Sequence, residues 1–377
     1  MNTRSGRLRV GLALDGAGWH PCAWQVTSVD RPADLFGAAF WTGLARRAEA
    51  GGAAFVTVED GISLQSERFG TPDRRGDQVR GRLDPVVAAA LLLSATERIE
   101  VVVSRNVTHH QPFQVAAQLA SLAAIAPGRL VWRPQVSANA ADAAVAGGRA
   151  TPALQPEDIY VPTKIARRLH TLFDDAEDFV RAVRQLWASF PGDSLAGSAD
   201  GTPRSFLDPE RVGTVRAAAG RYQADGPLNV PVLATPPVAV LAHHALEPYR
   251  LAAAVADRVF VTPGEESPAE ITQVLREIER LTPGAAPTEV YADVAVVLGD
   301  TAAHARQRRA ELEGLAGAAW TTDTSVFTGT AAELRDLLAT WAGQGLAGVR
   351  VRPAVIPEDA DRVVSDLLPL LREPSAP

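Results

Sequence analysis

Two consecutive helix–strand units within Arg82–Ser137 constrain the fold of this 377-residue chain more than any other feature. Asp84-Pro85 marks a helix start, because the first helical turn leaves unpaired the N–H that proline lacks. The apolar helix that follows leads into the β-branched run Ile99–Val103, which is typical of a buried parallel strand. A second helix over Phe113–Ala126 precedes another strand, Arg129–Trp132. Strand and helix in this alternation indicate a parallel sheet with crossover helices.

The same alternation continues along the chain and gives eight strands, each followed by at least one helix. We predict the strands at Leu8–Leu14, Ala53–Val58, Ile99–Val103, Arg129–Trp132, Val238–Ala242, Asp257–Val261, Glu289–Leu298 and Val349–Val351. Eight such units predict an α/β fold, a (β/α)8 TIM barrel with inserted helices and loops, and a doubly wound open sheet is the competing arrangement. The whole chain, 1–377, then forms one barrel domain with insertions around 61–82, 138–225 and 316–330, where the periodicity is lost.

Composition argues against several classes of protein. The formal net charge is −7 and the basic residues are scattered, so we expect no nucleic-acid partner. The single cysteine, Cys22, excludes a disulfide framework and a thiolate metal cluster. The N-terminal residues do not resemble a signal peptide, and no apolar run reaches the roughly 18 residues of a membrane span. We therefore expect a soluble, cytoplasmic protein with no membrane partner.

Polar side chains follow several of the predicted strands, which is where a parallel α/β fold collects its functional residues. Glu59 and Asp60 end the second strand. They are either a helix cap and a solvated charge or contacts to a cofactor or substrate. The ends of the third and fourth strands carry Ser104, Arg105, Asn106, Thr108, His109, His110, Arg133, Gln135 and Ser137. The chemistry is expected at this edge of the sheet.

Two constellations of these residues have familiar chemistries. The pairs His109-His110 and His243-His244, with Asp60 or Glu59, offer the imidazole and carboxylate groups that divalent metals prefer. Adjacent histidines on a loop point in opposite directions, however, and the chain has no HExxH motif, so no metal is expected. A triad of Ser104, His110 and Asp60 is disfavoured too, because no G-x-S-x-G nucleophile elbow is present.

Four blocks of sequence resemble the bacterial luciferase-like flavin monooxygenases, in their nitrilotriacetate-monooxygenase branch. The most specific block is Arg82–Trp132, and the others are LARRAEAGGAAFVTVEDGISL (Leu44–Leu64), FDDAEDFVRAVRQLW (Phe173–Trp187) and SFLDPERVGTVRAAAGRYQADGPLNVP (Ser205–Pro231). The last of these contains the GPLNVP signature of the branch, and a weaker likeness covers Phe327–Leu371.

The resemblance implies a two-component, FMNH2-dependent monooxygenase with a (β/α)8 barrel fold, in which a flavin C4a-hydroperoxide oxygenates a small organic substrate. It also implies a separate flavin reductase and a homodimer. The cofactor carries the difficult chemistry in such enzymes. Carried over to this sequence, the flavin-binding candidates are Asp60, Ser104, Asn106, Thr108, Arg133, Ser137, His243 and His244. Asn106 and His110 are the catalytic candidates.

The chain departs from the family pattern on the phosphate side of the flavin. Arg133 stands where the family has Asn, and the run Leu241–Ala245 (LAHHA) replaces a Gln-Ala-Gly-x-Ser run. Arg133 and the histidine pair could bind the phosphate as cations in place of backbone donors. Alternatively the protein is a flavin-poor or flavin-free homologue with a binding or partner-subunit role. A deazaflavin-dependent oxidoreductase is a further alternative, which the GPLNVP signature makes less favourable.

Overall fold

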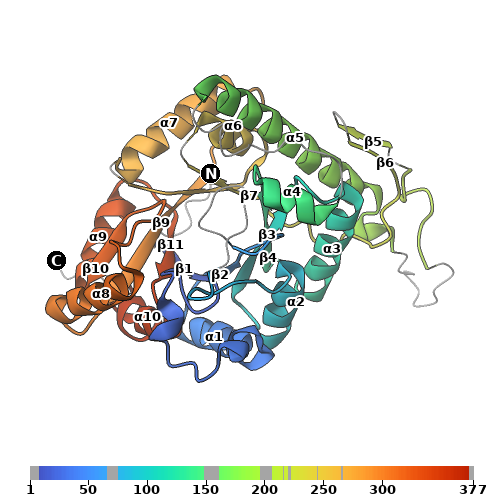
Figure 1. Ribbon diagram of the computed structural model, residues 1–377. Coiled ribbons are helices and arrows are strands. Elements are labelled where there is room, and N and C mark those ends of the chain that lie inside the picture. Colours follow the sequence, from blue (N-terminus) through green and yellow to red (C-terminus); the bar gives the residue numbers. More distant parts are fainter. Residues whose placement is uncertain are drawn as a thin grey trace.

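Eight parallel strands form a ring at the centre of the molecule (Figure 1). The computed structural model describes residues 8–65, 75–147, 161–195, 206–214, 216–219, 222–243, 245–264 and 266–372. The strands are β1 (Arg9–Leu14), β2 (Phe55–Val58), β3 (Glu100–Asn106), β4 (Leu130–Gln135), β7 (Ala239–Ala242), β8 (Arg258–Val261), β9 (Glu289–Leu298) and β11 (Gly348–Pro353). All eight predicted strands are confirmed, with ends that differ by a few residues.

The ring closes between β4 and β7. Hydrogen-bonded neighbours run β4-β3-β2-β1-β11-β9-β8-β7, and all of these pairs are parallel. A single parallel bridge, Trp132 to Val238, joins the two ends, and the Trp132 N–H donates to the Pro237 carbonyl at 2.9 Å. The predicted TIM barrel is therefore confirmed, and the open sheet is ruled out as the alternative.

A layer of helices surrounds the strands in Figure 1. It comprises α1 (Ala38–Gly51), α2 (Pro85–Ala95), α3 (Pro112–Ile125), α5 (Pro162–Ser189), α6 (Leu246–Val255), α7 (Pro268–Leu281), α8 (Ala302–Ala316), α9 (Ala331–Gly343), α10 (Glu358–Arg362), η5 (Val363–Leu367) and α11 (Leu368–Leu370). Sequence signals at the helix starts act as expected: the Asp84 carboxylate accepts from the Val86 and Val87 N–H groups, and Ser267 and Thr330 form capping boxes. In the described part of the chain, no helix has the length and apolar character needed to cross a membrane.

The part of the ring interior nearer the amino ends of the strands is packed with apolar side chains. Its members are Phe55, Val102, Val131, Ala239, Phe260 and Tyr291. Each comes from a different strand and occupies one of its inward-facing positions, which alternate with outward-facing ones. Gly11 makes room for them, because a Cβ at this position would lie 2.3 Å from the Phe55 ring. At the next inward positions toward the carboxyl ends, the interior becomes charged.

Three predicted irregular segments contain regular structure. In 138–163, the short helix α4 (Ala140–Ala146) forms, and α5 begins at Pro162, eleven residues before the block Phe173–Trp187. In 191–225, η4 (Gly192–Ser194) and an antiparallel hairpin of β5 (Arg216–Ala219) and β6 (Tyr222–Asp225) form outside the ring. In 316–330, β10 (Val326–Gly329) pairs with β9. These elements are short or lack an apolar stripe, so the hydrophobic pattern does not reveal them.

Candidate functional site

The polar residues predicted at the strand ends meet at the carboxyl edge of β2, β3 and β4. The Asp60 carboxylate accepts from the Asn106 N–H at 2.7 Å and from the Gly61 N–H at 2.8 Å. The Asn106 side-chain oxygen accepts from the His109 N–H at 2.9 Å, and Nδ1 of His110 lies 3.0 Å from the Asn106 carbonyl oxygen. Asp60 and Asn106 thus order the loop that carries both histidines.

Asp60 is buried and lies beside cations. Nη1 of Arg105 lies 3.8 Å from the Asp60 carboxylate and 2.9 Å from that of Asp84. Neither Asp60 nor Glu59 caps a helix, because the residues directly after them, 61–65, are not helical, and the next helix in the described part of the chain begins at Pro85 with Asp84 as its cap. The cap interpretation of Glu59 and Asp60 is therefore wrong.

The surroundings of His110 disfavour its charged form. Burial lowers the pKa of the His110 imidazole, and the Arg105 charge lowers it further, whereas Asp60, Asn106 and Asp84 raise it less. Burial is also the main cause that lowers the pKa of His109. The Ser104 hydroxyl lies 2.6 Å from Nη2 of Arg133 and accepts a hydrogen bond from it, so the described contacts do not assemble a Ser104–His110–Asp60 triad. Both histidines can bind and orient a ligand without carrying charge.

Ser137 is tied into a second group of contacts over the same edge. Its N–H donates to the Thr108 hydroxyl at 3.0 Å, and its own hydroxyl donates to the Asp142 carboxylate at 2.6 Å. Asp142, in the first turn of α4, also accepts from the Ser63 N–H at 3.1 Å. The structure therefore brings Thr108 and Ser137 together, as the sequence predicts, and adds an anionic side chain that the sequence did not indicate.

A layer of buried arginines and carboxylates fills the barrel below this edge. Arg133 pairs with Glu59, and Nη1 of Arg350 lies 3.4 Å from the same carboxylate. Arg350 also pairs with Asp293 at 2.9 Å, and Nε of Arg352 donates to Asp293 at 2.8 Å. Four of these five side chains are at most 3% exposed and Glu59 is 11% exposed, so the layer is part of the barrel core.

The layer perturbs its own ionisable groups. Burial raises the pKa of the Glu59 carboxyl, but the charges of Arg133, Arg350, Arg82 and Arg352 outweigh this and lower it to about 2. Burial lowers the pKa of Arg350 to about 10, against the opposing effect of Asp293. Glu59 is thus ionised at any working pH and balances a strongly positive surrounding.

Sequence reasoning missed Asp293, Arg350 and Arg352. A signal was present, because Arg350 and Arg352 alternate with valines in β11 and Asp293 interrupts the apolar strand β9. A charged residue at an inward position of a buried strand needs a partner inside the barrel. Such residues therefore indicate a buried ionic layer.

Two cavities open near this edge. One of about 230 Å³ lies between β4 and β7, and its polar lining residues are Glu59, Arg133, Gln135 and His243. His244, also predicted to bind the cofactor, lies outside the described residues. The other, also about 230 Å³, lies between the loop after β1 and the segment before α2, beside the Asp15–Arg82 ion pair. Within the described ranges, no three His, Cys, Asp or Glu side chains form a group that could hold a metal ion.

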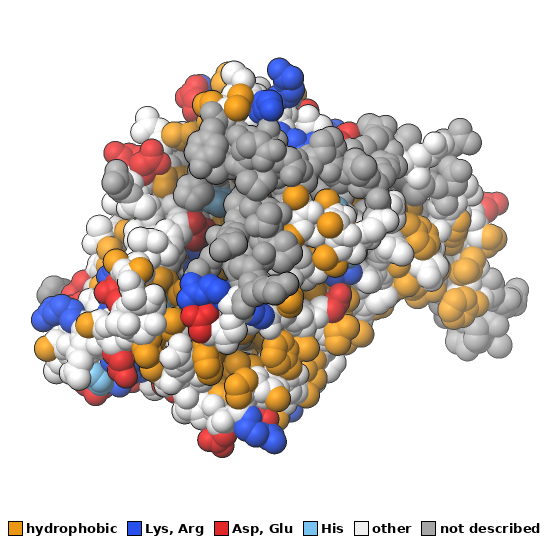
Figure 2. Space-filling model, in the orientation of Figure 1, with side chains coloured by type: hydrophobic (Ala, Val, Ile, Leu, Met, Phe, Trp, Pro, Cys, Tyr) orange, Lys and Arg blue, Asp and Glu red, His pale blue; other side chains and the backbone are white. Residues whose placement is uncertain are grey.

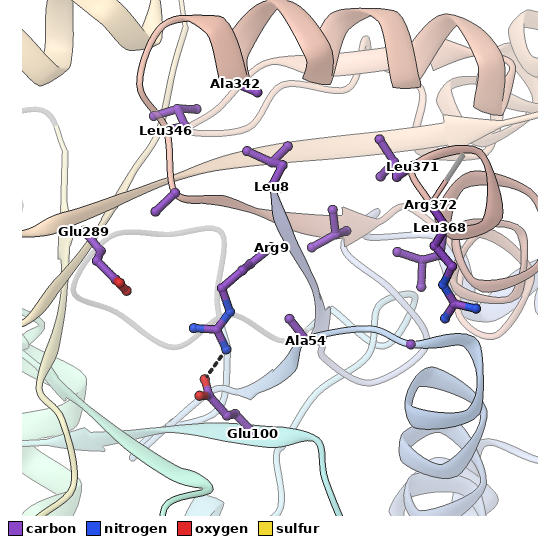
Figure 3. A pocket seen from close by; sticks show the side chains of 13 residues that line it. Leu8, Arg9, Ala54, Glu100, Glu289, Ala342, Leu346, Leu368, Leu371 and Arg372 are labelled. Carbon is purple, nitrogen blue, oxygen red and sulfur yellow. Dashed lines mark ion pairs between the residues drawn. The ribbon is translucent and has the colours of Figure 1, made fainter. Parts of the chain in front are cut away.

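A larger hollow of about 680 Å³ lies at the opposite, amino end of the strands (Figure 3). Ion pairs close the barrel there: Arg9 and Arg258 pair with Glu100 at 2.9 and 2.7 Å. The Arg9–Glu100 pair is visible in Figure 3, among apolar side chains such as Leu8 and Leu371. Position is more informative than cavity volume in this fold, because ligands of barrels bind at the carboxyl ends of the strands. The smaller cavities are therefore the better candidates.

Comparison with known proteins identifies the same family as the sequence blocks do. The model of the luciferase-like monooxygenase family matches residues 22–349. The chain is 25% identical over 284 residues to N-acetyl-S-(2-succino)cysteine monooxygenase of Bacillus subtilis, covering 74% of this chain and 58% of that protein. It is 27% identical over 237 residues to nitrilotriacetate monooxygenase component A of Aminobacter aminovorans, covering 60% of this chain and 47% of that protein. The matches thus span about half of these relatives.

Solved structures show the same fold. EDTA monooxygenase from Chelativorans sp. BNC1 superimposes with a TM-score of 0.79 at 20% identity, covering 97% of this chain and 93% of that one. The family model covers most of the chain, including β2 to β9 and the candidate site. The chain therefore belongs to the luciferase-like monooxygenase family.

Proposed function

We propose that the protein is the oxygenase of a two-component, FMNH2-dependent monooxygenase that acts on a small organic substrate. The observation that carries the proposal is the polar cluster at the ends of β2 to β4, where Asp60, Asn106 and His110 are held in fixed contact. The family membership supports the reaction class. Reduced FMN, when bound, would supply the activation of oxygen.

The residues at the mouth suit a flavin ring better than acid–base catalysis. Asp60 already accepts two backbone N–H groups, and Arg105 lies beside it, so it is not an available base. Nε2 of His109 is buried without a hydrogen-bond partner among the described residues. Such a group gains a partner from the carbonyl and N–H groups of a ring edge. We assign Asp60, Asn106, Thr108 and Ser137 to the ring side.

The residues that we assign to the phosphate side of the flavin are those that the sequence predicts. Arg133 and His243, the described residues expected on this side, line one cavity below the edge. His110 and Asn106 remain the candidates for contact with the reacting groups, and Ser104 supports Arg133. In this role His110 would position substrate as a neutral imidazole.

Further components are part of the same proposal. The name "component A" of the nitrilotriacetate relative implies a second component there, and we propose a separate flavin reductase for this protein as well. We also propose a homodimer in the cytoplasm. Helix α2 supports the dimer, because Val87 on this apolar helix is 66% exposed. Figure 2 shows hydrophobic side chains at the lower right, over the part of the ring that contains α2.

The test is an anaerobic titration of the purified protein with reduced FMN, with oxidised FMN as a control. Saturable, tighter binding of the reduced form supports the proposal, because this enzyme class receives its flavin already reduced. Binding of neither form contradicts it. A parallel titration with a reduced deazaflavin separates the deazaflavin-dependent alternative, which requires that this ligand bind in preference to FMN.

One observation favours a flavin-free homologue as the second candidate. The Ser137 hydroxyl, expected on the ring side of the flavin, donates to the Asp142 carboxylate at 2.6 Å, so a side chain of the protein already occupies that contact. A barrel retained as a partner subunit would keep this contact in every state. It would bind neither FMN nor a deazaflavin.

A further inference from the structure

The cavity between β4 and β7 lies at the weakest joint of the ring. The two strands meet through the single bridge of Trp132 and Val238, and above this bridge the space between them is open. Polar and apolar side chains both line the cavity. Its apolar lining comes from β4, β7, α5 and α6: Pro134, Val136, Phe173, Val240, Leu241, Pro248 and Leu251.

Arg133 lines this cavity and carries an unpaired donor. The side chain is 3% exposed, and its Nη2 contacts Glu59 and Ser104. Nη1 is buried, and no described residue accepts a hydrogen bond from it. The side-chain oxygen of Gln135, on the same wall, is likewise buried without a described partner. Leaving such groups unpaired costs about 1–3 kcal/mol each, and more for a charged group.

The charge around the cavity favours an anion. Arg133 shares the carboxylate of Glu59 with Arg350. Asp323, which pairs with Arg352 and is 29% exposed, brings the layer to three arginines and three carboxylates, so the case for an anion rests on Arg133, whose counter-ion is shared. A buried guanidinium with a shared counter-ion is stabilised by a further negative partner. The Gln135 amide can turn to donate to the same group, since its two ends are nearly isosteric.

The size of the cavity limits what enters it. Its volume of about 230 Å³ is below the roughly 300–1,000 Å³ of pockets that enclose a whole drug-sized ligand. A carboxylate on a short hydrocarbon chain matches both the donor of Arg133 and the apolar wall at Leu241 and Phe173.

We propose that this cavity is a substrate subsite that binds the carboxylate of a short-chain organic acid through Nη1 of Arg133. Its description as a substrate subsite rests on the proposed monooxygenase function, whereas the anion site itself does not. The sequence alone suggested the FMN phosphate as the anion that Arg133 binds. Both uses are anion binding, and they are separable by experiment.

The first experiment measures binding of butyrate, with its neutral isostere butyramide as the comparison, by isothermal titration calorimetry. We expect saturable binding of butyrate and much weaker binding of butyramide. Arg133→Lys keeps a cation beside Glu59 but removes the guanidinium fork. This variant should bind butyrate about ten-fold more weakly, or weaker still. Gln135→Glu places a carboxylate in the cavity and should have the same effect. Gln273→Glu, the same change at an exposed position of α7, should leave binding unchanged.

Three results would overturn the subsite: no butyrate binding, equal binding of butyramide, or unchanged butyrate affinity in both cavity variants. The source of the anion is tested by comparing FMN with riboflavin in wild type and Arg133→Lys. If Arg133→Lys loses affinity for FMN but not for riboflavin or butyrate, Arg133 binds the phosphate and the proposal is overturned. Failure of reduced FMN to bind, with butyrate binding intact, removes the monooxygenase function and leaves the carboxylate site.

Discussion

Glu59 is the carboxylate on which two buried arginines depend, so it should contribute strongly to stability. Removing one partner of a buried ion pair costs about 3–5 kcal/mol, because the remaining charge is left uncompensated. We predict that Glu59→Gln lowers the free energy of unfolding by about this amount in urea titrations. Glu97→Gln, at a side chain that is 86% exposed, should change it little. Equal stability of the Glu59→Gln variant and wild type would contradict the role of the buried layer.

The same residue predicts a pH dependence. The pKa of Glu59 is about 2 in the folded protein against an ordinary 4.5, so the folded state binds the proton less readily than the unfolded state. Its stabilisation is therefore complete above pH 4.5 and is lost as the pH falls from 4.5 toward 2. The stability difference between wild type and Glu59→Gln should shrink across this window. A difference that stays constant with pH would show that packing, not charge, accounts for the effect.

Asp142 should compete with an anion at Ser137. Its carboxylate accepts from the Ser137 hydroxyl at 2.6 Å and from the Ser63 hydroxyl at 2.5 Å. If the FMN phosphate binds at Ser137 in place of the flavin ring, Asp142→Asn should tighten FMN binding by about five-fold, since a like charge at about 4 Å costs about 1 kcal/mol in water. The affinity for riboflavin, which lacks the phosphate, should not change. Asp336→Asn, at an exposed helix position, is the matched control.

Fluorescence titration with both ligands checks this prediction. An equal gain for riboflavin would mean that the substitution loosens α4 instead of removing a competing charge.

Part of the site could be predicted from the sequence, and the rest depended on side-chain direction. Asp60 and Asn106 were expected together because parallel strands end at the same edge, and their contact at 2.7 Å confirms it. The contact between Ser137 and Asp142 was not foreseen, since α4 has no buried residue and gives no apolar period. The bonding of Arg133 to Glu59 depends on which face of β4 points inward. The sequence pattern alone left this open.

At the scale of elements, helices with strong local signals were predicted and those without them were not. Helices α7 and α9 carry such signals, because each begins with a capping box and continues with an apolar face. The first eleven residues of α5, before Phe173, are mostly exposed, so no apolar stripe marks them. Tertiary contacts, not local periodicity, determine where that helix begins.

Helix α2 should form part of a subunit interface. Its sequence, PVVAAALLLSA, has no charged residue, and Val87 is 66% exposed although Ala88, Ala89, Leu92 and Leu93 already face the core. We predict that Val87→Glu converts a dimer to a monomer, because a charge in an apolar interface loses its hydration. Val274→Glu on α7 should leave the dimer intact. Sedimentation velocity checks both, and a monomeric wild type or a dimeric Val87→Glu variant would contradict the prediction.

At the scale of the whole molecule, the ring is continuous at seven joints and thin at the eighth. β1 pairs with β2 on one side and with β11 on the other, so the first and last strands are neighbours. β4 and β7 share one bridge, and packing reinforces this joint: the Trp132 and Trp187 rings lie 5.9 Å apart, edge to face. The proposed carboxylate subsite occupies the gap above the bridge, so binding there should stabilise the joint.

Hydrogen exchange tests whether this joint opens first. Trp132 in β4, Val102 in β3 and Val351 in β11 are all at most 1% exposed, so burial alone predicts similar protection. Because local opening breaks the fewest hydrogen bonds at the β4–β7 joint, peptides that contain Trp132 should exchange faster than those from β3 or β11. Saturating butyrate should slow this exchange in wild type but not in Arg133→Lys. Equal protection of the three strands would mean that the tryptophan packing holds the joint as firmly as a full ladder. A fast joint that butyrate does not slow would place the acid elsewhere.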